Sequence, residues 1–180
     1  MQLYIFMIAS QKRPQTYRIL GIDPGFGRVG FGIIDCVGDK QTVVEYGCIE
    51  TDPKRSFIER LEDISDQLVT IIRTYKPQCA GVEELFFYKN VTTAIKVAHA
   101  RGVILLSLSK VKIPVHEYTP LQVKQSITGY GRADKTQLEA MVKVILGLKK
   151  KITPDDAADA LAIALTCAAS RKMEQVSGGR

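Results

Sequence analysis

Four acidic residues stand where an apolar run of the sequence meets a loop or begins a helix: Asp23, Glu83, Asp156 and Asp159. The first two each close an apolar run, and the last two stand three residues apart in a segment rich in alanine and leucine. A carboxylate at the edge of an apolar core costs stability unless a cation meets it there. If the fold brings the four together, they form an oxygen-lined site suited to Mg²⁺ or Mn²⁺.

Three of these acids also have a purely structural interpretation. Asp23 opens Asp-Pro-Gly, which is favourable turn chemistry, and Glu83 is a polar residue at the end of a strand. Asp156 lies in the first turn of an expected helix, for which Thr153 is the predicted N-cap and Pro154 the first residue. Any one of the three could therefore serve the fold alone.

Asp159 is harder to explain structurally. It lies past the first turn of that helix, whose residues 157–165 are otherwise apolar, so we expect it to be buried with only a metal ion as its partner. Asp156 shares its face of the helix. Two carboxylates about 4 Å apart repel by about 4 kcal/mol at an effective dielectric constant near 20, so converging acids take up protons or hold cations. Two magnesium ions can then promote hydrolysis of a phosphodiester without a nucleophilic side chain.

The composition is ordinary for a globular protein. Its 180 residues, 46% apolar and 24% charged, suffice for one domain with a sizeable core and exclude a disordered or collagen-like chain. The apolar stretch Leu3–Ala9 is too short to span a bilayer and lacks the flanks of a secretory signal, so we expect a cytoplasmic protein without a membrane partner. Cysteines stand at positions 36, 48, 79 and 167 with no close pair, and only His99 and His116 are present. This disfavours a zinc ribbon and favours a metal site made mainly of oxygen.

The net charge of +6 is unevenly distributed along the chain. Residues 1–86 hold 10 lysines and arginines against 12 acids, whereas residues 87–180 hold 15 against 7. A basic surface beside an acidic pocket suits a phosphate polymer that lysines hold and metal ions cleave. A solvated lysine-rich face would give the same composition.

The hydrophobic pattern predicts one α/β domain over residues 17–170, with a loose extension over 1–16 and a tail over 171–180. Three antiparallel strands are expected first, then an amphipathic helix whose apolar residues recur every three or four positions. Parallel strand–helix units follow. The predicted strands are 17–23, 29–36, 41–50, 78–83 and 113–118, and the predicted helices are 57–75, 92–108, 135–146 and 154–170.

Four segments together resemble the bacterial RuvC family of Holliday-junction resolvases: Leu-Gly-Ile-Asp-Pro-Gly at 20–25, Val-Glu at 82–83, Gln-Val-Lys-Gln at 122–125 and Asp-Ala-Ala-Asp-Ala-Leu-Ala at 156–162. The resemblance runs from about Ile19 to Ser170. It implies an RNase H-like fold, with a mixed five-stranded sheet of three antiparallel and then two parallel strands, flanked by helices. It places the family's catalytic, metal-binding acids on Asp23, Glu83, Asp156 and Asp159. These would hold two Mg²⁺ ions, which Mn²⁺ can replace, while the neighbouring Glu84 and Asp155 fall outside the motif.

The same resemblance implies DNA contacts in the basic half of the chain. Phe86 matches a position that stacks on unpaired bases near the junction centre, and Lys89 follows it. Lys124 and Lys135 match basic residues near the scissile phosphate, and Arg132 lies in the glycine-bearing loop before Lys135. The structural alternatives are an aromatic side chain that fills the core and lysines that are merely solvated.

The function that the resemblance implies is a structure-selective endodeoxyribonuclease. It would resolve four-way DNA junctions in recombination and repair by metal-dependent hydrolysis, with paired nicks in strands of like polarity. A homodimer would match the symmetry of the junction, and a RuvA–RuvB branch-migration complex would be a partner. We expect the helix over 92–108, with small residues at 94, 98 and 102, to form the dimer contact. Two alternatives stay open: a junction-binding module without catalysis, and a fragment of an actin or sugar-kinase-type ATPase, whose first phosphate loop resembles Gly-Ile-Asp-Pro-Gly.

Overall fold

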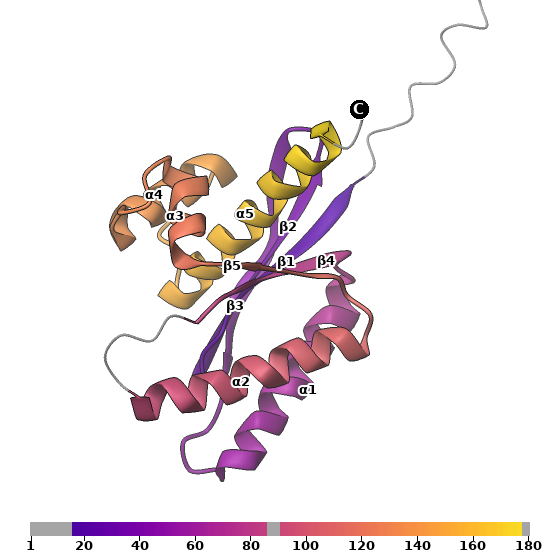
Figure 1. Ribbon diagram of the computed structural model, residues 1–180, viewed down its shortest axis with the longest axis vertical. Helices are drawn as coiled ribbons and strands as arrows, with labels where there is room; N and C mark the ends of the chain where they lie inside the picture. Colours follow the sequence, from indigo (N-terminus) through magenta and orange to yellow (C-terminus); the bar gives the residue numbers. More distant parts are fainter. Residues whose placement is uncertain (1–15, 86–90, 178–180) are drawn as a thin grey trace, which may run out of the picture.

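The computed structural model of the protein describes residues 16–85 and 91–177. Within them, five strands form one sheet in the order β3-β2-β1-β4-β5 (Figure 1). β1 pairs with β2, and β2 with β3, in antiparallel fashion, whereas the β1–β4 and β4–β5 pairs are parallel. This pairing confirms the predicted mixed sheet. The strands are β1 (Tyr17–Asp23), β2 (Arg28–Val37), β3 (Lys40–Glu50), β4 (Cys79–Glu83) and β5 (Val115–Tyr118).

Helices cover both faces of the sheet (Figure 1). α1 (Phe57–Tyr75) and α2 (Val91–Lys110) lie on one face, while α5 (Asp155–Ser177) lies on the other with α3 (Pro120–Thr128) and α4 (Lys135–Leu146) packed against it. Because side chains alternate across a strand, each face has its own core. Leu20 and Ile22 of β1 pack with α1 and α2, whereas Ile19 packs with α5.

α3 is a helix that the hydrophobic pattern does not predict. Its start signals are nevertheless present in the sequence, since Thr119 and Gln122 form a capping box and Pro120 occupies the first helical position. Gly129 ends the helix in a left-handed conformation with φ of 71°. The helix has only 9 residues, which is too short for a clear apolar period.

α5 also differs from its predicted bounds. It begins at Asp155 rather than Pro154, so Thr153 is not its N-cap, and it continues to Ser177, beyond the predicted end at Ser170. Polar contacts hold the added turns: the guanidinium of Arg171 lies 3.4 Å above the ring of Tyr17, and Lys172 pairs with Asp39. Such contacts with distant residues leave no apolar pattern in the sequence.

α5 lies close to the sheet because glycines face it. A Cβ added to Gly21 of β1 would stand 2.0 Å from the carbonyl oxygen of Ala160, and one added to Gly30 of β2 would stand 2.1 Å from that of Asp156. Any side chain at either position would push the helix away from the strands. The two glycines therefore set the height at which α5 holds its acids over the sheet.

No helix among the described residues is long and apolar enough to cross a membrane. The predicted extension over residues 1–16 lies outside the described part of the chain except for Thr16. The division into extension, domain and tail therefore stays a prediction.

Candidate active site

The four predicted acids lie at one end of the sheet, on the face that α5 covers. Asp23 is the last residue of β1 and Glu83 the last of β4, and these strands are parallel neighbours, so their carboxyl ends meet. Asp156 and Asp159 lie in the first turns of α5. Asp23 interacts electrostatically with all three of the others. The structure thus brings together the acids that the sequence indicated.

Burial and mutual repulsion change the protonation of these acids. Burial, followed by repulsion from the other three carboxylates, raises the pKa of Asp23 to about 8, while Lys135 opposes the shift. Burial, followed by repulsion from Asp159, raises the pKa of Glu83 to about 7. The pKa of Asp159 is raised too, above all by burial. The pKa of Asp23 and that of Glu83 stay raised although lysines lie nearby, so the positive charge around the acids does not offset burial and repulsion. A divalent cation would add positive charge and use the oxygen ligands that Mg²⁺ prefers.

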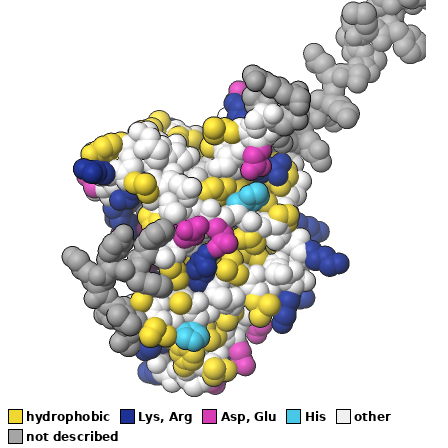
Figure 2. All heavy atoms as spheres, in the orientation of Figure 1, with side chains coloured by type: hydrophobic (Ala, Val, Ile, Leu, Met, Phe, Trp, Pro, Cys, Tyr) yellow, Lys and Arg dark blue, Asp and Glu magenta, His cyan; other side chains and the backbone are white. Residues whose placement is uncertain are grey.

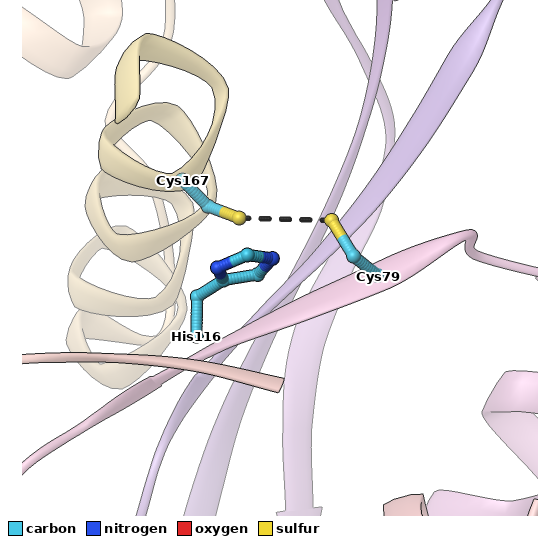
Figure 3. Close-up of side chains that lie close together, drawn as sticks. All are labelled: Cys79, His116 and Cys167. Atoms are coloured by element: carbon cyan, nitrogen blue, oxygen red, sulfur yellow. Dashed lines mark hydrogen bonds between the residues drawn. The ribbon is translucent and has the colours of Figure 1, made fainter. Parts of the chain in front are cut away.

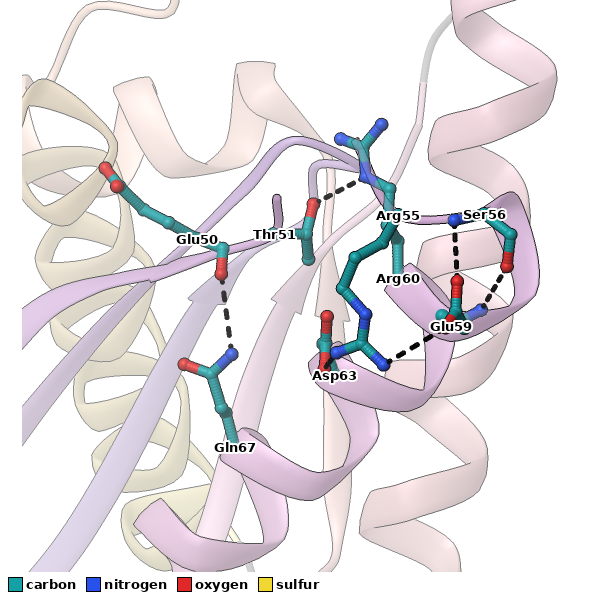
Figure 4. Close-up of polar contacts among 8 residues, drawn as sticks. All are labelled: Glu50, Thr51, Arg55, Ser56, Glu59, Arg60, Asp63 and Gln67. Atoms are coloured by element: carbon teal, nitrogen blue, oxygen red, sulfur yellow. Dashed lines mark hydrogen bonds and ion pairs between the residues drawn. The ribbon is translucent and has the colours of Figure 1, made fainter. Parts of the chain in front are cut away.

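The loop after β1 is anchored, which fixes the position of Asp23. Phe26 of this loop stacks on Phe57 of α1 with ring centroids 5.1 Å apart, and the guanidinium of Arg60 lies 4.1 Å above the Phe26 ring. Nε of Arg60 also donates to Oγ1 of Thr51 at 2.9 Å (Figure 4). The Thr51 hydroxyl in turn donates to the carbonyl oxygen of Phe26 at 2.9 Å. α1 therefore holds the turn that carries the first acid.

The end of β4 is held from two sides. Nε of Arg101 on α2 donates to the main-chain carbonyl oxygen of Glu83 at 3.1 Å, and the same guanidinium pairs with Glu117 of β5. The main-chain N–H of Glu84 donates to the carbonyl oxygen of Tyr118 at 2.8 Å. Arg101 thus positions the backbone that carries the second acid, a role that the sequence pattern does not indicate.

Asp159 has a protein partner, so the prediction that only a metal ion would meet it was wrong. Nζ of Lys135, the first residue of α4, lies 3.0 Å from Oδ2 of Asp159, whose side chain is 27% exposed. Asp134 caps α4 through a capping box with Gln137 and so fixes where this helix begins. The ion pair depends on how α4 packs on α5, which the pattern within either helix does not reveal.

Asp156 also has partners that the sequence analysis missed. Nε of Arg28, at the start of β2, lies 3.2 Å from Oδ2 of Asp156, and Sγ of Cys48 lies 3.8 Å from the same oxygen. Cys48 stands opposite Gly30 in the β2–β3 ladder, directly below the first turn of α5. Burial, followed by repulsion from Asp156, raises the pKa of the Cys48 thiol to about 12, so it is a neutral hydrogen-bond donor there. Side chains alternate across β2 and β3, so Arg28 and Cys48 lie on the face of the sheet that α5 covers. This alternation could have indicated both residues from the sequence.

A pocket of about 230 Å³ opens beside the acids. Glu83 and Asp159 line it together with Lys124 of α3 and Lys135 of α4, and Pro120, Val123 and Leu138 complete its lining. Lys124 lies close enough to Glu83 to lower the pKa of that carboxyl against the effect of burial. Acids and lysines that face one pocket can hold cations and a phosphate group side by side.

The structure describes only some of the other residues predicted to contact DNA or to neighbour the acids. Phe86 and Lys89 lie outside the described residues, and Arg132 lies in the turn before α4, where it is exposed. Asp155, one of the two neighbouring acids, has an exposed side chain that pairs with Lys151 at 3.4 Å. Glu84 follows the last residue of β4.

Comparison with known proteins adds an independent finding. Residues 19–167 match the family model described as Crossover junction endodeoxyribonuclease RuvC. A protein of that name from Petrotoga mobilis is 53% identical over 146 residues, which are 81% of this chain and 90% of the relative. A structure of RuvC from Thermus thermophilus superposes with a TM-score of 0.81 at 36% identity, and the T. thermophilus RuvC in complex with a Holliday junction substrate superposes with a TM-score of 0.82 at 36% identity. Both cover 87% of this chain and 96% of their own.

Proposed function

The chain belongs to the RuvC family of crossover junction endodeoxyribonucleases, and on that premise we propose that Asp23, Glu83, Asp156 and Asp159 form its active site. The chain is an endonuclease that resolves Holliday junctions, and its fold is RNase H-like. This membership decides against an ATPase fragment and against a binding module without catalysis.

The proposed metal ion is Mg²⁺, two per site, with Mn²⁺ as a substitute. The observation that carries this proposal is the convergence of four carboxylates from β1, β4 and α5, whose repulsion, together with burial, raises the pKa of Asp23. Such a group of carboxylates favours hard divalent cations. When bound, two such ions would activate a water and stabilise the leaving oxygen of a phosphodiester. The protein's part is to hold the four carboxylates at fixed positions on β1, β4 and α5.

Lys124 and Lys135 are the proposed contacts to the scissile phosphate, because both line the pocket beside Glu83 and Asp159. Lys135 now neutralises Asp159 at 3.0 Å, and it is free to contact a phosphate oxygen once cations neutralise that acid instead. Arg132 and Lys89, and Phe86 through stacking, are proposed to hold the junction outside the pocket. Junction binding would then come mainly from the basic half of the chain.

A homodimer is proposed, with α2 at its contact. Ile95 and Leu106 of α2 are 52% and 54% exposed. Leu106 also lines a shallow depression of about 410 Å³, together with Leu61, Ala98, His99, Gly102 and Val103. Figure 2 shows hydrophobic side chains spread over the lower part of this face, where α2 crosses it in Figure 1. An apolar face with small residues at 98 and 102 lets two helices approach closely, and a two-fold dimer would offer two active sites to a junction.

A RuvA–RuvB complex as partner and a cytoplasmic location are further proposals that rest on the family. They follow from the implied role in recombination of chromosomal DNA.

The direct test is to incubate a synthetic four-way junction with the protein, with Mg²⁺ and with a chelator. We expect paired nicks in two strands of like polarity when Mg²⁺ is present and none when it is removed. A linear duplex of the same sequence serves as the control and should stay intact. Cleavage that persists in chelator would contradict the proposed metal site.

A further inference from the structure

Two cysteines and a histidine gather on the α5 face of the sheet, at the other end from the acids. Cys79 is the first residue of β4, the strand that Glu83 ends, and His116 lies in the edge strand β5. Cys167 is on α5, about 12 Å along the helix axis from Asp159. The three come from separate elements, and none belongs to the proposed active site.

The geometry of the three side chains resembles that of a tetrahedral metal site. The sulfurs of Cys79 and Cys167 lie 3.6 Å apart, and the imidazole of His116 lies beside both (Figure 3). One ligand atom from each residue lies within 4.8 Å of the other two. Two Zn–S bonds of about 2.3 Å at the tetrahedral angle separate their sulfurs by about 3.8 Å, so the thiols already have nearly the required spacing. His116 is half-buried at the sheet edge, with one ring nitrogen within 4.8 Å of both sulfurs.

Of the two sulfurs, Cys79 is the one whose surroundings favour a thiolate, because the hydrogen bond to Cys79 and burial raise the pKa of Cys167. A bound cation would deprotonate both thiols. A hydrogen bond from the Cys167 thiol is the main cause that lowers the pKa of Cys79 to about 7, and the Tyr17 hydroxyl and Arg171 add to it against the effect of burial. Tyr118 supplies a separate observation. Its hydroxyl is buried and interacts with Ser170 and Cys167, but it makes no hydrogen bond of normal geometry with any described residue. A buried phenol that is so weakly satisfied gains a stronger acceptor if Cys167 becomes a thiolate.

We propose that Cys79, His116 and Cys167 bind one thiolate-preferring divalent cation, with Zn²⁺ as the best-suited ion, in a site separate from the acidic one. The two thiolates balance the charge of the ion, so the nearby Arg171 is not repelled by it. A water that enters beside His116 fills the fourth coordination position. A disulfide between the same cysteines is the competing interpretation. It leaves His116 without a role, whereas a metal site uses all three donors.

The consequence would be structural. The ion would tie α5 to β4 and β5, and the first two of these elements carry Asp159 and Glu83. Metal ligands from separate elements convert binding free energy into stability of the folded state. Zn²⁺ would thereby stabilise the packing that brings the acids together, although it takes no part in the cleavage step.

The test is a Co²⁺ titration of the full chain, purified under reducing conditions and freed of metal. We expect one Co²⁺ per chain to give the thiolate-to-metal charge-transfer band and the visible bands of a tetrahedral site, and Zn²⁺ to displace it. Cys79→Ser and Cys167→Ser should abolish the charge-transfer band, and His116→Asn should weaken binding by roughly tenfold or more. Cys36→Ser is the matched control, since Cys36 is a half-buried cysteine of the same sheet outside the triad, and it should keep the band.

Two further measurements distinguish loss of the metal site from loss of the fold. Circular dichroism checks that each variant folds, and Zn²⁺ should raise the melting temperature of the wild type but not that of Cys167→Ser. Asp159→Asn should keep the charge-transfer band, so failure of this site and failure of the acidic site are distinguishable. The proposal is overturned if the wild type shows no such band, if Cys167→Ser retains it, or if mass spectrometry finds Cys79 joined to Cys167 in a disulfide after reducing purification.

Discussion

Nζ of Lys135 lies 3.0 Å from Oδ2 of Asp159, so a lysine from one helix neutralises the acid that the next helix carries. The hydrogen bond from this ammonium opposes the burial that raises the pKa of Asp159, and the same contact raises the pKa of Lys135. The pair joins α4 to α5 beside a pocket that Lys124 and Glu83 also line. Lys135 therefore lies where its ammonium can pair with Asp159 in the metal-free protein and with a phosphate oxygen when DNA is bound.

Lys135→Met should lower the cleavage rate of a four-way junction by about 10²-fold, the usual cost of removing one charge that stabilises a transition state. Its Kd for the junction should rise much less, because other cations contact the DNA. Lys151→Met is the matched control, since that lysine pairs with the exposed Asp155 and should leave cleavage unchanged. Single-turnover cleavage measures the effect, and wild-type rates in Lys135→Met would contradict the role.

Gly21→Ala should destabilise the protein by about 1–3 kcal/mol, because its Cβ would stand 2.0 Å from the carbonyl oxygen of Ala160 and force α5 off the sheet. Cleavage should fall as well, since α5 carries two of the acids. Gly27→Ala is the control, because a Cβ there meets only the flexible end of Arg60 at 3.6 Å. Urea unfolding compares the two, and equal stability of both variants would mean that α5 is not held by this close approach.

Stability of the metal-free protein should depend on pH through Asp23 and Glu83. Their pKa values of about 8 and about 7 in the folded protein lie above the ordinary values of 3.8 and 4.5. The folded state therefore keeps protons that the unfolded chain has released, so the contribution of these groups is full below about pH 4 and is lost as the pH rises to about 8. Asp23→Asn, in chelator at pH 8, should be more stable than the wild type.

The comparison between Asp23→Asn and the wild type isolates this effect, because Asp35, whose pKa is lowered by Arg18, titrates in both proteins. Thermal melts from pH 4 to pH 8 in chelator give the measurement. A stability difference that does not change over this range would show that Asp23 is not held protonated.

Junction affinity should fall steeply with salt, because residues 87–180 carry the positive excess of the chain. Replacing one phosphate contact, by Lys124→Ala or Arg132→Ala, should reduce the slope of log K against log salt by about 1. Lys76→Ala, an exposed change at the C-terminal cap of α1, should leave the slope unaltered. Fluorescence anisotropy at several salt concentrations gives the slopes, and a flat salt response of the wild type would count against the basic half as the DNA surface.

The fold could be predicted largely from alternation and turn chemistry. The meander of β1, β2 and β3 follows from three apolar runs, the last two of which are joined by a turn at Gly38. α1 follows from its apolar period, with the predicted bounds 57–75 observed in full. α3 and the end of α5 could not be predicted, because a short capped helix and a polar helix end depend on capping and tertiary contacts rather than on hydrophobic period.

The residues of the candidate site also divide into those that the sequence predicts and those that only packing brings together. Asp23 and Glu83 could be predicted because each ends a strand, and because parallel pairing brings the ends of β1 and β4 together. The RuvC motif selected Asp156 and Asp159, since the helix pattern does not separate Asp156 from its neighbour Asp155. Two of their partners could not be predicted, since Lys135 and Arg101 meet the acids or their backbone only after the helices pack on the sheet. The nearness of Cys79 to Cys167 likewise arises from packing, since 88 residues separate them in sequence.

The most direct test of the four-acid site compares Asp159→Asn with Asp155→Asn in cleavage and binding of a synthetic four-way junction with Mg²⁺. Asp159 shares the site with Asp23 and Glu83, whereas Asp155 is exposed beside Lys151. We expect Asp159→Asn to lose cleavage by about 10²-fold or more while still binding the junction, and Asp155→Asn to cut at nearly the wild-type rate. Normal cleavage by Asp159→Asn, or a loss confined to Asp155→Asn, would contradict the assignment of the four acids.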